Sequence, residues 1–270
     1  MKQETRLAGY YWNEVLNETR QGAPITVWRT YMRRVYLHLI QTWLPNGSGL
    51  ALKTDLFEEA VTPHYLLPDL GMGSVGMDFS PAVVRTARQQ LGTAAGGCPL
   101  MVSDLRNLPV QSGSFARILS GSSLDHFDVK ADIATGLSEL ARILAPGGTL
   151  VVAFDNPQNP IIALRNHLPF KWLKRLHLVP YFIGATYSIA EAREKLEMLG
   201  LDVIDVTAFA HAPRAPAIWL VALAERLHWS QMQVFIARIL DSLESLGRLP
   251  TRYWTGYYIA LQVKKPINLD

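Results

Sequence analysis

Polar residues close several short apolar runs in the first half of the chain. These runs cover residues 50–54, 74–78, 100–104 and 115–120. In a doubly wound α/β sheet, ligands bind beyond the carboxyl ends of the strands, so the closing residues would share one crevice. An acid after the second strand can accept hydrogen bonds from both ribose hydroxyls, and an acid after the third can accept one from an adenine amino group. Asp78 and Asp104 therefore suit an adenosine group, although each is also an ordinary turn or cap residue.

Alternating strands and helices are expected to position these residues. From residue 49 to about 156, short apolar runs alternate with helical stretches, which is the rhythm of repeated strand–helix units. The spacing predicts helices over 81–90 and 132–144, the first with Ser80 as N-cap and Pro81 in its first turn. An Ala-Pro-Gly-Gly segment then stops the second helix and turns into a strand. Later elements are a strand over 149–155, a helix over 189–199, and strands over 203–209 and 256–263.

Three segments fall outside this alternation. Residues 1–48 read as a helical leader or lid, because their apolar residues recur at three- and four-residue spacing. The main domain is expected over 49–270, with cap insertions at about 157–187 and 213–250. The first insertion is rich in proline and aromatic residues. The second is amphipathic, and it is apolar enough to enlarge a hydrophobic pocket or to form a homodimer face.

The composition indicates a globular protein of weak overall charge. With 270 residues, 49% of them apolar, the chain can build a large core, and a net charge of +3 is far from the basic stripe of a nucleic-acid-binding protein. The single cysteine, Cys98, excludes an internal disulfide and a cysteine-based metal site, so we expect no metal and a cytoplasmic location. Charged residues interrupt the most apolar stretch, 217–240, and the N-terminus lacks an apolar signal core.

Three longer segments of the central region have a distinctive order. They are VGMDFSPAVVRTARQQ at 75–90, VSDLRNLPVQSGSFARILSGSSLDHF at 102–127 and LSELARILAPGGTLVVAFDNP at 137–157. Together they resemble the class I S-adenosylmethionine-dependent methyltransferases, in particular those of ubiquinone and menaquinone biosynthesis. The resemblance covers about residues 49–210 and a last strand at 256–263. It implies a Rossmann-like, doubly wound seven-stranded sheet with an antiparallel last strand, N-terminal helices and helical cap insertions.

The resemblance also implies S-adenosyl-L-methionine as cofactor and indicates which residues would contact it. The expected cofactor residues are Lys53, Thr54, Asp55, Leu56, Phe57, Asp78, Phe79, Asp104, Leu105, Ser120, Gly121 and Ser122. Asp125 and His126 stand where the family often has paired polar residues facing the acceptor, which makes them candidate catalytic residues. In the alternative interpretation, Asp125 caps the following helix and His126 packs against the adenine.

The first strand ends in a sequence that departs from the family pattern. The family has an acid followed by spaced glycines, whereas this chain has KTDLFEEA at 53–60. Lys53 stands at the usual acid, and Asp55 and Phe57 stand near the first two glycines. Their side chains must therefore point away from the cofactor, or the loop must take another path. The segments KTDLFEEA and DNPQNP…LRNHLP resemble a recurrent subgroup of methyltransferase-like sequences that lack the glycine loop.

Three interpretations of this departure compete. In the first, the cofactor pocket has decayed in a pseudoenzyme. In the second, side chains such as Thr54 and Asp55 hold the methionine end of the cofactor. In the third, the glycines at 71–76 replace the missing glycine loop. The last is disfavoured because those glycines precede a strand and do not open a helix. We favour the second, because Asp78 and Asp104 remain suited to an adenosine group.

Acceptor contacts are expected from the leader, the caps and the loops after strands five and six. The candidate substrate-binding residues are Tyr11, Arg29, Asn156, Asn159, Tyr181, Tyr187 and His211. Isolated aromatic residues are more often core than site, so packing is the alternative for these tyrosines. The basic segment 165–175 alternates bulky apolar residues with cations, which fits a solvated face, a lid over an apolar molecule, or a peripheral membrane contact with anionic lipid.

The favoured function is methyl transfer to a small, hydrophobic metabolite at oxygen, nitrogen or carbon, with no nucleic-acid partner. Transfer from a sulfonium is an in-line displacement, so the site must align donor and acceptor and supply a base where the acceptor is protonated. Two alternatives stay open: a non-catalytic binding or scaffold protein on the same fold, and a cyclase or isomerase that uses the sulfonium charge.

Overall fold

The computed structural model describes residues 2–44, 47–63, 65–92, 97–121, 123–175 and 184–267. In these residues, seven strands form one sheet in the order β3-β2-β1-β4-β5-β7-β6. The strands are β1 (Leu50–Lys53), β2 (Ser74–Asp78), β3 (Leu100–Val102), β4 (Phe115–Ser120), β5 (Leu144–Asp155), β6 (Asp202–Phe209) and β7 (Tyr258–Lys264). The pairs among β1–β5 are parallel, and β7 is antiparallel to β5 and β6. The predicted sheet with an antiparallel last strand is confirmed.

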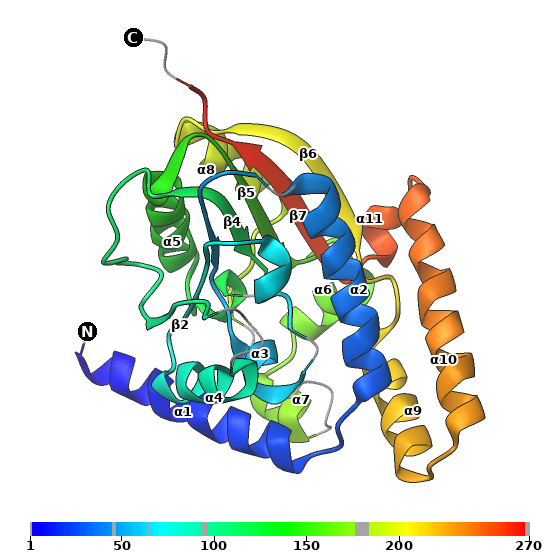
Figure 1. The fold of residues 1–270 in the computed structure, drawn as a ribbon. Helices are drawn as coiled ribbons and strands as arrows, with labels where there is room; N and C mark the ends of the chain where they lie inside the picture. Colours follow the sequence, from blue (N-terminus) through cyan, green and yellow to red (C-terminus); the bar gives the residue numbers. More distant parts are fainter. Residues whose placement is uncertain are drawn as a thin grey trace.

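Helices cover both faces of the sheet (Figure 1). They are α1 (Lys2–Gln21), α2 (Thr26–Trp43), α3 (Phe57–Val61), α4 (Pro81–Leu91), α5 (Lys130–Ile143), α6 (Pro160–Asn166), α7 (Phe170–Arg175), α8 (Ile189–Met198), α9 (Arg214–Arg226), α10 (Ser230–Leu243) and α11 (Arg252–Thr255), with 3₁₀ helices at Leu67–Leu70, Leu124–His126 and Glu244–Arg248. Successive residues of β5 point to opposite faces: Val151 packs in the core beneath α2–α4, and Val152 in the core beneath α5 and α8. Burial on both faces explains why the strands are nearly continuous apolar runs.

Two predicted strand boundaries are wrong, the end of β3 and the start of β5. β3 ends at Val102, so Asp104 lies in the following loop and does not close the strand. β5 begins at Leu144 and not at 149, because Leu144 pairs with Phe115 before the register shifts. The Ala-Pro-Gly-Gly segment therefore stops α5 as predicted, but it lies inside the sheet, with Gly147 in the left-handed region at φ 74°.

The leader and the second insertion pack together beside the sheet. A separate apolar core joins α2 to α9 and α10 through residues such as Tyr31, Val221 and Leu240. The second insertion is thus a helical hairpin, whereas the first forms α6 and α7. None of the helices in the described ranges is long and apolar enough to cross a membrane. The division of the chain at residue 48 stays a prediction.

Candidate functional site

A cavity of about 490 Å³ lies at the carboxyl ends of β1, β2 and β4. Its size is within the range of small-molecule sites. Eleven of the predicted site residues line it: Arg29, Lys53, Thr54, Asp55, Phe57, Asp78, Phe79, Asp104, Leu105, Gly121 and His126. The fold therefore brings together most of the residues that sequence analysis assigned to a cofactor.

Other predicted residues lie elsewhere. Those outside the cavity lining are Tyr11, Leu56, Ser120, Asp125, Asn156, Asn159, Tyr187 and His211. Ser122 and Tyr181 lie outside the described residues. Leu56 is a core residue, and the Ser120 hydroxyl accepts a hydrogen bond from the Thr54 hydroxyl at 3.1 Å. Both residues therefore contact residues of the cavity lining without lining the cavity themselves.

Asp78 ends β2 and binds backbone groups of two neighbouring segments. Its Oδ2 accepts a hydrogen bond from the N–H of Leu56 at 3.0 Å, and its Oδ1 accepts one from the N–H of Ser80 at 2.8 Å. Burial and the nearby Asp55 carboxylate raise the pKa of Asp78 to about 7, despite these hydrogen bonds. The carboxyl connects the first loop to β2, and each oxygen keeps a lone pair for a ligand hydroxyl.

Asp104 is held in an ion-pair network at the cavity wall. Nη2 of Arg106 lies 2.8 Å from Oδ2 of Asp104, and Nη1 lies 2.8 Å from Oδ2 of Asp132. Burial alone would raise the pKa of Asp104, but the hydrogen bonds and charge of Arg106 lower it overall. Arg106 thus fixes the Asp104 carboxylate and uses part of the hydrogen-bonding capacity that we assigned to an adenine amino group.

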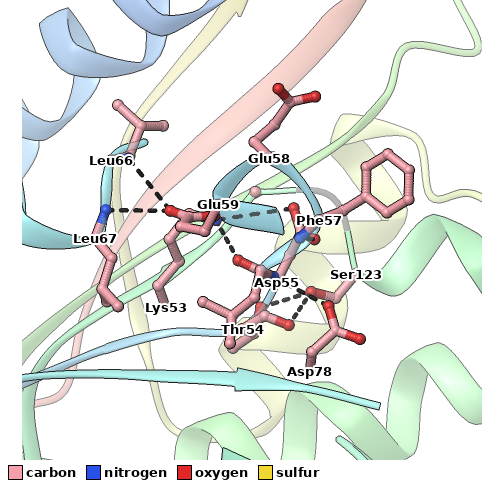
Figure 2. Close-up of polar contacts among 12 residues, drawn as sticks. Lys53, Thr54, Asp55, Phe57, Glu58, Glu59, Leu66, Leu67, Asp78 and Ser123 are labelled. Carbon is pink, nitrogen blue, oxygen red and sulfur yellow. Dashed lines mark hydrogen bonds and ion pairs between the residues drawn. The ribbon is translucent and has the colours of Figure 1, made fainter. Parts of the chain in front are cut away.

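A buried ion pair holds the KTDLFEEA segment (Figure 2). Nζ of Lys53 lies 2.9 Å from Oε2 of Glu59 and also donates a hydrogen bond to the backbone carbonyl of Asp55. Oε1 of Glu59 accepts hydrogen bonds from the N–H groups of Leu66 and Leu67, both at 3.2 Å. The exposed fraction is 5% for Lys53 and 0% for Glu59. These contacts fix the path of the loop without glycine.

The opposite charges of Lys53 and Glu59 offset part of the cost of burying the two groups. Burial by itself would lower the pKa of Lys53, but the Glu59 and Asp55 carboxylates raise it overall. Burial raises the pKa of Glu59, and the Lys53 charge opposes that rise. Phe57, at a usual glycine position, packs edge to face on Trp12 with ring centroids 6.0 Å apart. The Phe57 ring therefore contacts the leader at the cavity wall, while Leu56 packs in the core.

A hydroxyl cluster joins the ends of β1 and β4. The hydroxyl oxygens of Thr54 and Ser123 are 2.7 Å apart, and the Ser123 hydroxyl also donates to the Thr54 carbonyl at 2.7 Å. Oδ1 of Asp55 accepts a hydrogen bond from the N–H of Phe57 at 2.9 Å. Thr54, Asp55 and Ser123 all line the cavity, so polar oxygen atoms occupy this part of its wall.

The leader, α9 and β7 supply a further part of the lining. These residues are Trp12, Trp28, Arg29, Met32, Arg33, Tyr36, Arg214 and Tyr258. The Tyr36 hydroxyl donates to the Gly121 carbonyl at 2.9 Å, which connects α2 to the end of β4. The sequence did not indicate Met32, Arg33, Tyr36, Arg214 or Tyr258 as site residues, because the pattern of a helix or strand marks a buried face without indicating that the face borders a cavity.

His126 and Asp125 have different surroundings. His126 lines the cavity and packs edge to face on Trp12, with ring centroids 4.6 Å apart. Asp125 is buried, and its Oδ2 accepts a hydrogen bond from the N–H of Asp155 at 2.7 Å. Burial and the Asp155 carboxylate raise the pKa of Asp125 well above its usual range. Asp125 does not cap α5, because Val129 is the N-cap residue of that helix.

Other predicted acceptor residues hold loops together. Nδ2 of Asn156 donates to the carbonyls of Tyr253 and Gly256 at 2.7 and 2.9 Å. The Tyr187 hydroxyl donates to the Lys130 carbonyl at 3.1 Å. Nδ2 of Asn159 donates to the carbonyls of Thr255 and Gly256. Nδ1 of His211 forms a hydrogen bond with the Thr255 hydroxyl.

Arg165 of the basic cap is buried. Its Nη2 lies 2.6 Å from Oδ2 of Asp155, and its Nη1 donates to the Tyr257 hydroxyl at 3.0 Å. Arg165 therefore belongs to the interior and not to a solvated face. The described residues contain no group of three or more His, Cys, Asp or Glu that could hold a metal ion.

Known proteins share this fold and part of this sequence. Residues 60–152 match the family described as "Methyltransferase domain". A segment of 91 residues is 34% identical to "Probable tRNA methyltransferase 9B" of Mus musculus and covers 34% of this chain and 19% of that protein. A segment of 115 residues is 32% identical to "Demethylmenaquinone methyltransferase" of Deinococcus radiodurans and covers 42% of this chain and 44% of that protein. The chain thus spans less than half the length of these two relatives.

One solved structure with this fold is the geranyl diphosphate C-methyltransferase from Streptomyces coelicolor A3(2), solved with geranyl diphosphate and S-adenosyl-L-homocysteine. The TM-score is 0.54 at 12% identity, over 86% of this chain and 79% of that one. This likeness shows the fold. The match to the methyltransferase domain over 60–152 lies within the region that shares this fold.

Proposed function

We propose that this protein transfers the methyl group of S-adenosyl-L-methionine to oxygen, nitrogen or carbon of a small, largely apolar acceptor. One observation carries the proposal: the cavity at the strand ends joins carboxylates suited to an adenosine with a wall of aromatic and apolar side chains. Asp78 and Asp104 belong to the first part, and Trp28, Met32 and Tyr36 belong to the second. An apolar acceptor would bury its surface against that wall.

The residues at the strand ends fit the parts of the cofactor. The two oxygens of Asp78 each keep a lone pair that can accept a ribose hydroxyl, and Phe79 and Leu105 add apolar surface to the lining. Thr54 and Asp55 supply oxygen atoms near the end of β1 that suit an ammonium group. When bound, the cofactor supplies the transferable methyl group, and these residues hold it and orient it towards the acceptor.

Calorimetry tests the cofactor assignment directly. We expect S-adenosyl-L-methionine and S-adenosyl-L-homocysteine to bind the purified chain at one site with micromolar affinity, typical of enzyme cofactors and substrates. Absence of heat at millimolar ligand would contradict the proposal. It would favour instead a non-catalytic protein on the same fold, for which the glycine-free first loop is the motivating observation.

His126 is proposed as the polar group that faces the acceptor. If it acts as a base, the His126→Phe variant should keep cofactor affinity, because phenylalanine preserves the ring contact with Trp12, while kcat falls about 10²–10⁴-fold. The measurement is a pair of assays, cofactor titration and methyl transfer from labelled cofactor. An unchanged kcat in the His126→Phe variant would assign His126 to packing.

A further inference from the structure

The outward face of the α9–α10 hairpin is apolar and aromatic. α9 exposes Trp219 and Leu223, which lie four residues apart and so share one side of the helix. α10 exposes Phe235 and Ile239 at the same spacing, and the exposed fractions of Trp219 and Phe235 are 65% and 57%. Trp229, in the turn between the helices, is also exposed. Figure 1 shows this hairpin at one edge of the molecule, beyond α2.

The opposite face of the hairpin is buried and accounts for its folding. Val221 of α9 and Ile236 and Leu240 of α10 pack with Trp28 and Tyr31 of α2. Because this face already provides the apolar contacts that fold the hairpin, the outward residues are not needed for the core. Exposed apolar side chains that gather on one surface mark an interaction site.

The acids of the hairpin have partners within the protein, although Asp241 and its partner stay about half exposed. Oε1 of Glu225 accepts a hydrogen bond from the N–H of Val27 at 3.0 Å. Asp241 forms an ion pair with Arg34 at 2.7 Å, and the N–H of His211 donates to Glu244 at 2.8 Å.

Apart from Arg214, which lines the cavity, the cations of the hairpin are exposed. Arg226, His228 and Arg238 are all exposed. Because the acids contact other parts of the protein, the outward face combines apolar and aromatic side chains with positive charge.

We propose that the α9–α10 hairpin is a membrane-binding surface that lies on anionic lipid without crossing the bilayer. Tryptophan and leucine side chains bury at the boundary between headgroups and acyl chains, and arginines beside them attract anionic headgroups. The helices have 13 and 14 residues, too few to span. A second copy of this chain would add the same positive charges to the interface and no exposed acids of this face to pair with them, so charge complementarity favours lipid.

The surface lies next to the cavity along the chain. α9 begins at Arg214, which lines the cavity, and runs into the exposed stripe of Trp219 and Leu223. A chain bound to lipid through this hairpin would hold its cavity near a reservoir of apolar molecules. Lipid binding does not depend on methyl transfer, so the two proposals succeed or fail separately.

Flotation with lipid vesicles tests the proposal on the full chain. Binding is expected to vesicles of equal parts phosphatidylcholine and phosphatidylglycerol, and to be weaker with phosphatidylcholine alone. The W219E/L223E variant should bind at least about tenfold more weakly, because two buried apolar side chains become charged. The R226Q/R238Q variant should lose about fivefold per arginine. The Met198→Glu variant is the matched control, because Met198 is an exposed apolar residue of α8, whose inner face packs in the other core.

Three outcomes would overturn the proposal. One is absence of binding to either vesicle at millimolar lipid. Another is equal binding by wild type and both hairpin variants, with thermal denaturation showing that the variants are folded. The third is a wild-type dimer in light scattering that W219E/L223E converts to monomer while no vesicle binds, which would assign the face to a second copy of the chain.

Discussion

Replacement of Lys53 by methionine is expected to lower the free energy of unfolding by about 3–5 kcal/mol, the usual cost of removing one partner from a buried ion pair. The variant leaves the fully buried Glu59 without its opposing charge. Methionine fills much of the same volume, so a cavity contributes little. Urea denaturation of wild type and variant, followed by circular dichroism, measures the difference. The effect would be among the largest in the chain, because the pair also fixes the loop at the cavity.

The double variant Lys53→Met/Glu59→Gln separates lost charge from lost packing. Glutamine keeps a carbonyl oxygen for the N–H groups of Leu66 and Leu67, while no charge remains buried. Since a buried ion pair can often be replaced by neutral groups at little cost, the double variant should recover most of the stability. A double variant less stable than Lys53→Met would contradict this account.

The stability deficit of Lys53→Met should depend on pH. In wild type, burial already raises the pKa of Glu59 against the opposing Lys53 charge, and loss of that charge should raise it further above the unfolded value of about 4.3. An acid whose pKa is raised by folding costs no stability below its unfolded pKa, and the cost grows as pH rises towards the folded pKa. The deficit relative to wild type is therefore expected to be smaller at pH 5 than at pH 8. An equal deficit at both values would indicate that lost packing, not charge, is responsible.

The sheet was predictable because its determinants are local. Apolar runs and helix caps such as Ser80, whose hydroxyl accepts the N–H of Val83 at 3.3 Å, mark elements from sequence alone. The carboxyl-end rule for parallel sheets then places Asp78 and Thr54 in one cavity. Residue type and order were sufficient for these positions.

The partners of the first loop were not predictable, because they depend on packing between distant segments. No sequence pattern marks Glu59 as buried, yet it is enclosed in the interior and binds the backbone of Leu66. Asp125 reads as catalytic, yet its carboxyl contacts the backbone of β5, thirty residues later. Arg214 has no motif at all and reaches the cavity only because the second insertion packs against α2.

Asp78→Ala is expected to weaken cofactor binding at least about 100-fold. Each hydrogen bond to a charged group contributes about 1.5–3 kcal/mol, and the proposed ribose contacts use both carboxylate oxygens. The variant also releases the N–H of Leu56, which loosens the first loop. Calorimetry measures the change, and Asp202→Ala, at an exposed position on β6, is the control that should bind as wild type does. Unchanged affinity in Asp78→Ala would remove the adenosine assignment.

The same contact predicts how cofactor affinity varies with pH. Ribose hydroxyls donate to the charged carboxylate, and burial with the Asp55 charge raises the pKa of Asp78 to about 7 in the protein without ligand. Affinity should therefore rise between pH 6 and pH 8 and level off above, because protonated Asp78 must first lose its proton. Asp55→Asn removes the repulsion that raises this pKa, so its profile should move to lower pH. Any titration of the ligand itself affects wild type and Asp55→Asn equally, so it cancels in the comparison. If the two pH profiles of affinity coincide, Asp78 does not control binding.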